Sequence, residues 1–198
     1  MDSKFHIYGT KVAKLYPEHL PESILSDPKR NAEKKVFEAL SGLASSFVVF
    51  YSVAWQSRKE GSARDGEADF VIAHPDYGVL VLEVKGGGVS FDAISGQWTT
   101  VDRYGNSYLI DPIDQARKSH YKLLDKFKDL REWDNSRLLT IGHAVCFPDV
   151  IVGNKQLKLD LPREIVVDHD DLQNIDETIQ RIFEHWADKS KRSPLGRV

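Results

Sequence analysis

Two stretches in the middle of the chain, Glu67–Ala73 and Gly78–Lys85, are almost continuously apolar apart from a few charged positions. Strands that are buried on both faces of a sheet show this pattern, so both stretches predict central strands. The four residues that separate them, His74–Tyr77, include Pro75 and Asp76 and have the composition of a turn. We therefore expect the two strands to pair as a hairpin.

Other segments with strand patterns surround this hairpin. Phe47–Trp55 alternates and is rich in β-branched and aromatic residues, whereas the polar, glycine-bearing Gln56–Gly66 predicts a loop. Short alternating pieces separated by turn residues predict a small antiparallel meander after the glycines that follow Lys85. The predicted meander strands and the two later strands are Val89–Phe91, Gln97–Arg103, Ser107–Ile110, Leu138–Phe147 and Glu164–Val167.

Three segments have apolar residues at helical spacing. Ser26-Asp27-Pro28 and Asp111-Pro112 each place a capping residue before a proline, which is typical of a helix start. The first apolar stripe runs to about Ala44, the second begins at Ile113, and a closing helix spans Leu172 to Trp186. The order of the elements predicts an α/β fold, a central mixed β-sheet flanked by helices.

The length of 198 residues fits one domain, given about 150 residues as a typical domain size. We interpret residues 1–26 as an N-terminal arm, 27–188 as the domain and 189–198 as a basic tail. The chain shows neither a secretory signal nor a stretch long enough to cross a membrane, and its one cysteine, Cys146, suggests a reducing compartment. We expect a cytoplasmic protein.

The candidate chemistry lies in the predicted hairpin. Asp69 stands near the start of one strand, and Glu83 and Lys85 stand two residues apart near the end of the next, on one sheet face. Charged side chains in buried strands are costly unless they are paired or bind a metal. The alternative is a structural ion-pair network, but the joint spacing and the following glycines, Gly86 to Gly88, favour a site.

A hard divalent cation suits these residues. Mg²⁺ prefers a few carboxylates and keeps water and phosphate oxygens as its other ligands. We predict Asp69, Glu83 and the backbone carbonyl of Val84 as ligands of Mg²⁺, which Mn²⁺ could replace. Lys85 would orient or help to deprotonate the attacking water, or neutralise developing charge.

Four blocks of the sequence together resemble the nuclease-related domain (NERD), a family of the PD-(D/E)xK restriction-endonuclease-like superfamily. Glu83-Val84-Lys85, separated from Asp69 by thirteen residues, is similar to the D…E-x-K signature, and the likeness runs from about Asn31 to Leu124. The other blocks are Asn31-Ala32-Glu33, Gly66-Glu67-Ala68-Asp69-Phe70 and Asp111-Pro112-Ile113-Asp114-Gln115-Ala116. Family members often have Asn-Pro where this chain has Asp111-Pro112, a change that preserves the cap.

The resemblance implies Mg²⁺-dependent hydrolysis of DNA phosphodiester bonds, with Asp69 and Glu83 as metal ligands and Lys85 catalytic. It also implies supporting catalytic roles for Glu33 and Gln115, and a possible fused or partner helicase. From the residues alone, Glu33 is equally well explained as solvated helix surface and Gln115 as a residue at a helix start.

An alternative function is a non-catalytic nucleic-acid or protein interaction module that retains the nuclease fold. The net charge of −3 supports it, because nucleic-acid binders usually carry a surplus of basic residues. The run Asp168-His169-Asp170-Asp171 resembles a metal site, but we interpret it as solvated capping acids before a helix. His120 and His143 are interpreted as satisfied core histidines.

Overall fold

A computed structural model describes residues 12–59, 62–92, 95–102, 104–131, 140–153 and 161–189. The strands in this part of the chain are β1 (Lys14–Tyr16), β2 (Val48–Lys59), β3 (Ser62–His74), β4 (Gly78–Val84), β5 (Gly88–Asp92), β6 (Gln97–Val101), β7 (Ser107–Ile110), β8 (Ile141–Phe147) and β9 (Val166–Asp168). The α-helices are α1 (Glu22–Leu25), α2 (Asn31–Ser41), α3 (Pro112–Lys128) and α4 (Ile175–Lys189). None of the helices described is long and apolar enough to cross a membrane.

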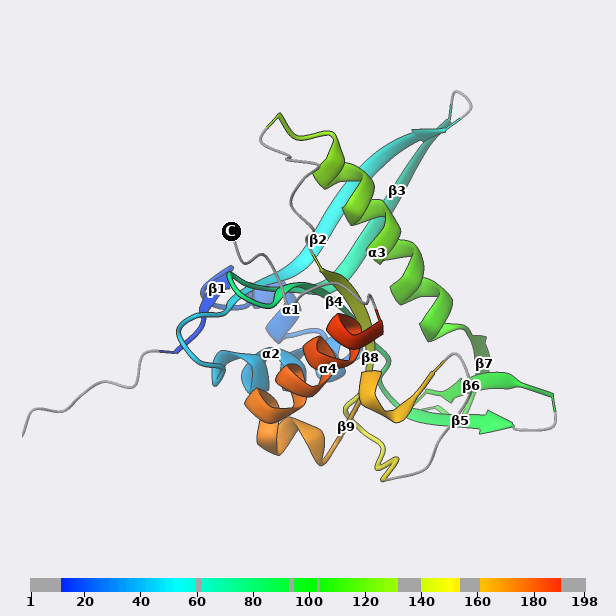
Figure 1. The fold of residues 1–198 in the computed structure, drawn as a ribbon. Helices are drawn as coiled ribbons and strands as arrows, with labels where there is room; N and C mark the ends of the chain where they lie inside the picture. Colours follow the sequence, from blue (N-terminus) through cyan, green and yellow to red (C-terminus); the bar gives the residue numbers. More distant parts are fainter. Residues whose placement is uncertain are drawn as a thin grey trace, which may run out of the picture.

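The main sheet contains six strands in the order β1-β2-β3-β4-β8-β9 (Figure 1). Strands β2, β3 and β4 pair antiparallel, while β1 on β2, β8 on β4 and β9 on β8 pair parallel. The sheet is therefore mixed and flanked by helices, which confirms the predicted fold class. The hairpin predicted around His74–Tyr77 is also confirmed, since Phe70 pairs with Leu82 and His74 with Gly78.

Two apolar layers cover the sheet. Leu80 and Leu82 of β4 pack in one core with residues of α2 and α4, such as Leu40 and Ile182. The alternate residues Val79 and Val81 pack in a second core that includes Leu123 of α3. Figure 1 accordingly shows α2 and α4 next to each other, with α3 apart from them and running along β3. This alternation means that a side chain at position 83 lies on the α3 side of the sheet.

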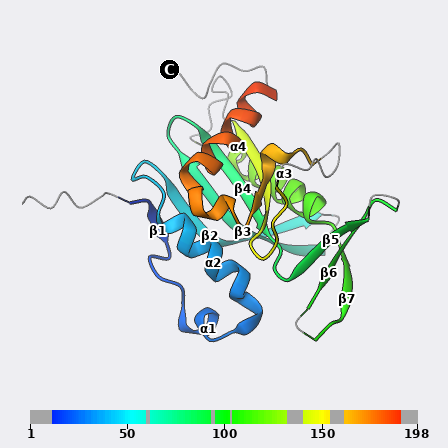
Figure 2. The same cartoon turned by 90° about the horizontal axis from the view of Figure 1, so that it is seen from below.

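Strands β5, β6 and β7 form a separate three-stranded antiparallel sheet, as the predicted meander requires. Figure 2 shows this small sheet standing to one side of the main sheet. Trp98 of β6 stacks on Phe147 of β8 with ring centroids 5.4 Å apart. Through this contact the small sheet packs against the main core. The small sheet begins at Gly88, directly after the segment that carries Glu83 and Lys85.

The predicted helix starts agree with the structure. Asp111 accepts a hydrogen bond from the backbone N–H of Asp114 and so caps α3, with Pro112 at its first position. Asp27 accepts from the N–H of Lys29 and caps a 3₁₀ helix, Pro28–Arg30, that leads into α2. Both caps satisfy backbone donors that a helix start would otherwise leave without partners.

Some predictions about elements were wrong. Most of Gln56–Gly66 is strand, because β2 continues to Lys59 and β3 starts at Ser62. The prediction of a loop rested on the polar composition of this segment. A two-stranded ribbon can have this composition, because it needs no continuous apolar face. The interpretation of residues 1–26 as an arm misses β1, which pairs parallel with β2 at Lys14–Val48. The start of the predicted strand at Leu138, the first residues of the arm, 1–11, and nearly all of the predicted tail lie outside the described residues.

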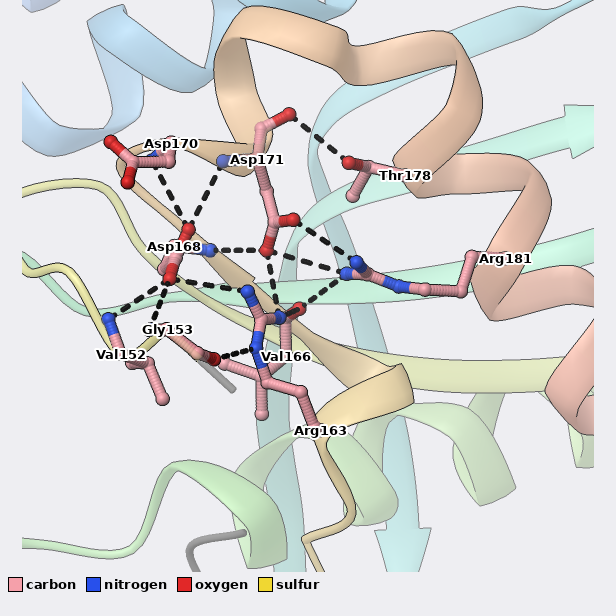
Figure 3. A network of polar contacts seen from close by, with 9 residues as sticks. All are labelled: Val152, Gly153, Arg163, Val166, Asp168, Asp170, Asp171, Thr178 and Arg181. Atoms are coloured by element: carbon pink, nitrogen blue, oxygen red, sulfur yellow. Dashed lines mark hydrogen bonds and ion pairs between the residues drawn. The ribbon is translucent and has the colours of Figure 1, made fainter. Parts of the chain in front are cut away.

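In the run Asp168–Asp171, the carboxylates of Asp168 and Asp171 form an ion-pair network, so the prediction that they are solvated was wrong (Figure 3). The predicted capping is found at Asp168, which accepts from backbone N–H groups at the start of the next 3₁₀ helix. Asp168 is only 1% exposed and accepts hydrogen bonds from the backbone N–H groups of Val152, Gly153, Asp170 and Asp171. Arg163 contacts both Asp168 and Asp171, and Arg181 of α4 also contacts Asp171. A buried carboxylate needs such partners. The network ties α4 to the end of β9 and to the loop after β8.

Candidate active site

Asp69 lies where β3 and β4 stop pairing. The last residue pair of their ladder is Phe70–Leu82. Beyond this pair, the side chain of Asp69 accepts a hydrogen bond from the backbone of β4. Its Oδ2 accepts a hydrogen bond of 2.7 Å from the backbone N–H of Val84. Asp69 is thereby fixed beside the Glu83–Lys85 end of β4, where the predicted hairpin places it.

The opposite neighbour of Asp69, strand β2, is irregular at the same level. Tyr51 pairs with Phe70 and Val53 pairs with Ala68, and between these pairs Ser52 has a left-handed φ of 55°. Tyr51 and Phe70 face the α2 side of the sheet, whereas Val53 and Ala68 face the α3 side. Side-chain alternation therefore shifts at Asp69. Strained backbone of this kind is concentrated at functional sites.

Glu83 and Lys85 form an ion pair next to Asp69. The distance from Lys85 Nζ to Glu83 Oε1 is 2.7 Å, and Glu83 is 7% exposed. Lys85 itself is anchored through its backbone N–H, which donates to the carbonyl of Cys146 on β8. The amine is thus held at the sheet end with its charge directed at a buried carboxylate.

The electrostatics of the site show excess negative charge. Burial, and next the charge of Glu83, raise the pKa of Asp69 to about 7, against the opposing effects of the Val84 N–H and of Lys85. Two carboxylates that share a poorly solvated position repel each other. A cation placed between them would relieve this repulsion.

The donor set fits a hard divalent ion that keeps ligands from solvent or substrate. Among the residues described, no group of three or more histidine, cysteine, aspartate and glutamate side chains is arranged to hold a metal ion. Asp69 and Glu83 provide two carboxylates, which matches the small number of protein ligands typical of Mg²⁺ at phosphate sites. Val84 follows Glu83 in the chain and donates its backbone N–H to Asp69, and the role of its backbone carbonyl as a metal ligand stays a prediction.

Glu33 points from the start of α2 toward the sheet. Both of its carboxylate oxygens accept from Arg30 Nη1, at 2.7 and 2.9 Å, and Oε2 also accepts from the hydroxyl of Tyr51. Only 13% of its side chain is exposed, so it is not solvated helix surface. Its charge adds to the upward shift of the pKa of Asp69, which places Glu33 within electrostatic reach of Asp69.

Gln115 is not brought into this group. Its side chain is exposed in the first turn of α3, and its backbone N–H donates to the carbonyl of Asp111. None of the hydrogen bonds given for the described residues joins it to Asp69, Glu83 or Lys85. Its catalytic role stays a prediction that this geometry does not support.

Tyr51 and Arg30 are the neighbours of the site that the sequence did not single out. Tyr51 alternates with apolar residues in a strand, a pattern that marks it only as core, and Arg30 stands in a charged stretch. Burial, together with the hydrogen bond to Glu33, raises the pKa of Tyr51 well above its usual value, so its hydroxyl remains a proton donor. No signal in the sequence pointed to them, because the burial of Glu33, which makes such partners necessary, follows from tertiary packing.

His120 and His143 are core histidines, as expected. His120 of α3 and His143 of β8 are buried, with their Nδ1 atoms 3.0 Å apart. The indole N–H of Trp186 donates to the His143 carbonyl. Cys146 is fully buried, and burial raises the pKa of its thiol, which is unfavourable for a nucleophile.

Fold and geometry together define a class: an α/β protein whose mixed sheet brings two carboxylates and a lysine to one strand end. The family model described as nuclease-related domain (NERD) matches residues 28–148. The chain therefore belongs to the nuclease-related domain family, which is part of the restriction-endonuclease-like superfamily. The comparisons with curated proteins and with solved structures gave no match. The family indicates a nuclease-related function.

Proposed function

We propose that the protein is a Mg²⁺-dependent nuclease that hydrolyses DNA phosphodiester bonds. The observation that carries this proposal is the convergence of Asp69 and Glu83, both partly or fully buried, with Lys85 beside them. Repulsion between the carboxylates is the condition under which a divalent cation binds with a gain in stability. Mn²⁺ has similar ligand preferences and is expected to substitute.

Each residue has a distinct task in this proposal. Asp69 and Glu83, with the carbonyl of Val84, would hold the cation, and the Val84 N–H fixes the orientation of Asp69. When bound, the cation supplies Lewis-acid stabilisation of the scissile phosphate and a more acidic water. Lys85, held at 2.7 Å from Glu83, orients the attacking water, helps to deprotonate it or neutralises developing negative charge. Glu33, held by Arg30 and Tyr51, is a supporting carboxylate.

The direct test is cleavage of linear, circular and single-stranded DNA by the purified protein, with Mg²⁺ or Mn²⁺ and with EDTA. We expect cleavage that needs the metal and is lost in both Asp69→Ala and Lys85→Ala. Cleavage that persists in both variants would come from a contaminant, and the proposal would fall. The three forms of DNA also distinguish endonuclease from exonuclease action.

A second candidate is a nucleic-acid or protein interaction module without catalysis that works with a fused or partner helicase. Two observations favour it: the net charge of −3, and the pairing of Arg117 and Lys118 on α3 with Asp114, which reduces their charge for DNA. DNA affinity without cleavage, unchanged in Asp69→Ala and Glu83→Ala, would support this function over the first.

A further inference from the structure

The contacts of Glu33 make it unlike the other two carboxylates of the site. Glu83 forms an ion pair with Lys85, and Asp69 accepts a hydrogen bond from a backbone N–H. Both oxygens of Glu33, in contrast, accept from one guanidinium nitrogen of Arg30, and one of them also accepts from the hydroxyl of Tyr51. A carboxylate that is occupied in this way has little capacity left for a metal ion.

Glu33 is nevertheless held close to Asp69 and to the end of β4 by two separate contacts between elements. Tyr51, which donates to Glu33, pairs with Phe70, the residue next to Asp69. On the other side, α2 packs against the segment after Lys85: a Cβ built on Gly86 would lie 2.6 Å from the Cβ of Ala32, the neighbour of Glu33. The distance between the start of α2 and the end of β4 is therefore set by direct packing.

Arg30 is accessible to an additional anionic partner. Its side chain is 38% exposed, and its hydrogen bonds within the described residues use Nη1 alone. A guanidinium has a planar fork of donors that matches phosphate, and a bidentate phosphate contact uses two of its nitrogens. A substrate phosphate that takes Nη1 as one of its two nitrogens would compete with Glu33 for the Arg30 guanidinium.

We propose that Arg30 is a phosphate-binding residue that masks Glu33 in the free protein and releases it when a substrate phosphate arrives. Tyr51 keeps Glu33 directed at the site throughout, so the released carboxylate joins Asp69 and Glu83 as a third acidic group. The consequence is a further divalent-cation position that becomes available only with a phosphate ligand. This inference rests on the proposed function, because it uses the same pair of carboxylates.

The test counts bound metal ions rather than turnover. Mn²⁺ is titrated into the metal-free protein by calorimetry and by electron paramagnetic resonance, with and without thymidine 3′,5′-bisphosphate, which has phosphates but no phosphodiester bond to cleave. We expect the wild type to bind an additional Mn²⁺ only with the bisphosphate. Arg30→Met should bind that ion without the bisphosphate, with affinity raised about tenfold, and Glu33→Gln should lack it under both conditions.

Tyr51→Phe is the matched control, because it removes a hydrogen bond from Glu33 and leaves Arg30 in place. The additional ion should then bind more weakly, but still only with the bisphosphate. Arg30→Gln is a second variant without the charge, and circular dichroism confirms that each variant is folded. If wild type and both Arg30 variants bind the same number of ions without bisphosphate, the inference is overturned while the proposed function stands. If none of the proteins binds Mn²⁺, the proposed function fails and the inference fails with it.

Discussion

Asp69 and Glu83 differ in how their charge is compensated. Glu83 has an ammonium group at 2.7 Å, whereas the hydrogen bond identified for Asp69 comes from a neutral backbone donor, the Val84 N–H. Burial and the charge of Glu83 raise the pKa of Asp69 to about 7. Without a metal, the ionised form of Asp69 therefore destabilises the folded protein near neutral pH.

A dependence of stability on pH follows from this shift. Because the pKa of Asp69 is raised from 3.8 to about 7, its contribution to stability is fully present at low pH and is lost as the pH rises through 7. In EDTA, we expect the free energy of unfolding to fall by on the order of 2 kcal/mol between pH 5 and pH 8. Urea unfolding of wild type and Asp69→Asn measures it. The amide can still accept from Val84, so the variant should show a flatter profile and higher stability at pH 8; identical profiles would contradict the assignment.

Substitution of Lys85 should affect metal binding and DNA cleavage differently. Lys85→Met removes the cation beside Glu83, so Mn²⁺ affinity should stay equal or rise. Turnover should nevertheless fall by about 100-fold or more, because a group that acts on the water or on developing charge is lost. Calorimetry with Mn²⁺ and a DNA cleavage assay measure the two effects. Asp69→Asn serves as the contrast, since it should weaken both, and a parallel loss of both in Lys85→Met would instead mean a structural role.

The sequence could predict the group Asp69, Glu83 and Lys85 because all three stand at fixed spacing in two adjacent strands. Tyr51 and Arg30 could not be predicted, because their contacts with Glu33 join a helix start to a strand through tertiary packing. A pattern along the chain contains no information about which face of α2 meets which residue of β2.

Helix α2 packs closely against the segment that follows β4. Gly86→Ala should destabilise the fold by roughly 1–3 kcal/mol, because its Cβ would lie 2.6 Å from that of Ala32. Ala32→Gly alone should cost about 1 kcal/mol for a glycine within a helix. In the double variant, the removed methyl makes room for the added one, so the loss should be smaller than the sum. Urea unfolding of the four proteins gives this coupling, and additive losses would show that the two residues do not meet.

The elements could be predicted from sequence wherever burial sets the pattern. Strands β3 and β4 and helix α3 pack against apolar cores, and their hydrophobic periodicity predicted them. The continuation of β2 to Lys59 and the strand β1 could not be predicted in the same way. Pairing of the polar ribbon depends on backbone hydrogen bonds rather than on an apolar face, and the three residues of β1 are too few to show a period.

For the whole molecule, stability and the candidate chemistry depend on different acidic groups. Asp168 is 1% exposed and serves four backbone N–H groups and Arg163, at the junction of α4 with β9 (Figure 3). Asp168→Ala should therefore lower the free energy of unfolding by roughly 3–5 kcal/mol. Asp170→Ala, in the same run but exposed and without a capping hydrogen bond, should change it by about 0.5 kcal/mol or less.

Urea unfolding measures these two losses, and Mn²⁺ titration of the folded variants at low temperature shows whether the site is affected. We expect both variants to bind Mn²⁺ as the wild type does, because Asp69 and Glu83 contact neither residue among the interactions identified. Weaker Mn²⁺ binding in Asp168→Ala alone would mean that the loop after β8 transmits strain to the site. That route exists in principle, since Asp149 of this loop accepts from the N–H of Gly87 and pairs with Lys35 of α2. Unchanged affinity would show that the C-terminal network stabilises the fold without shaping the metal-binding carboxylates.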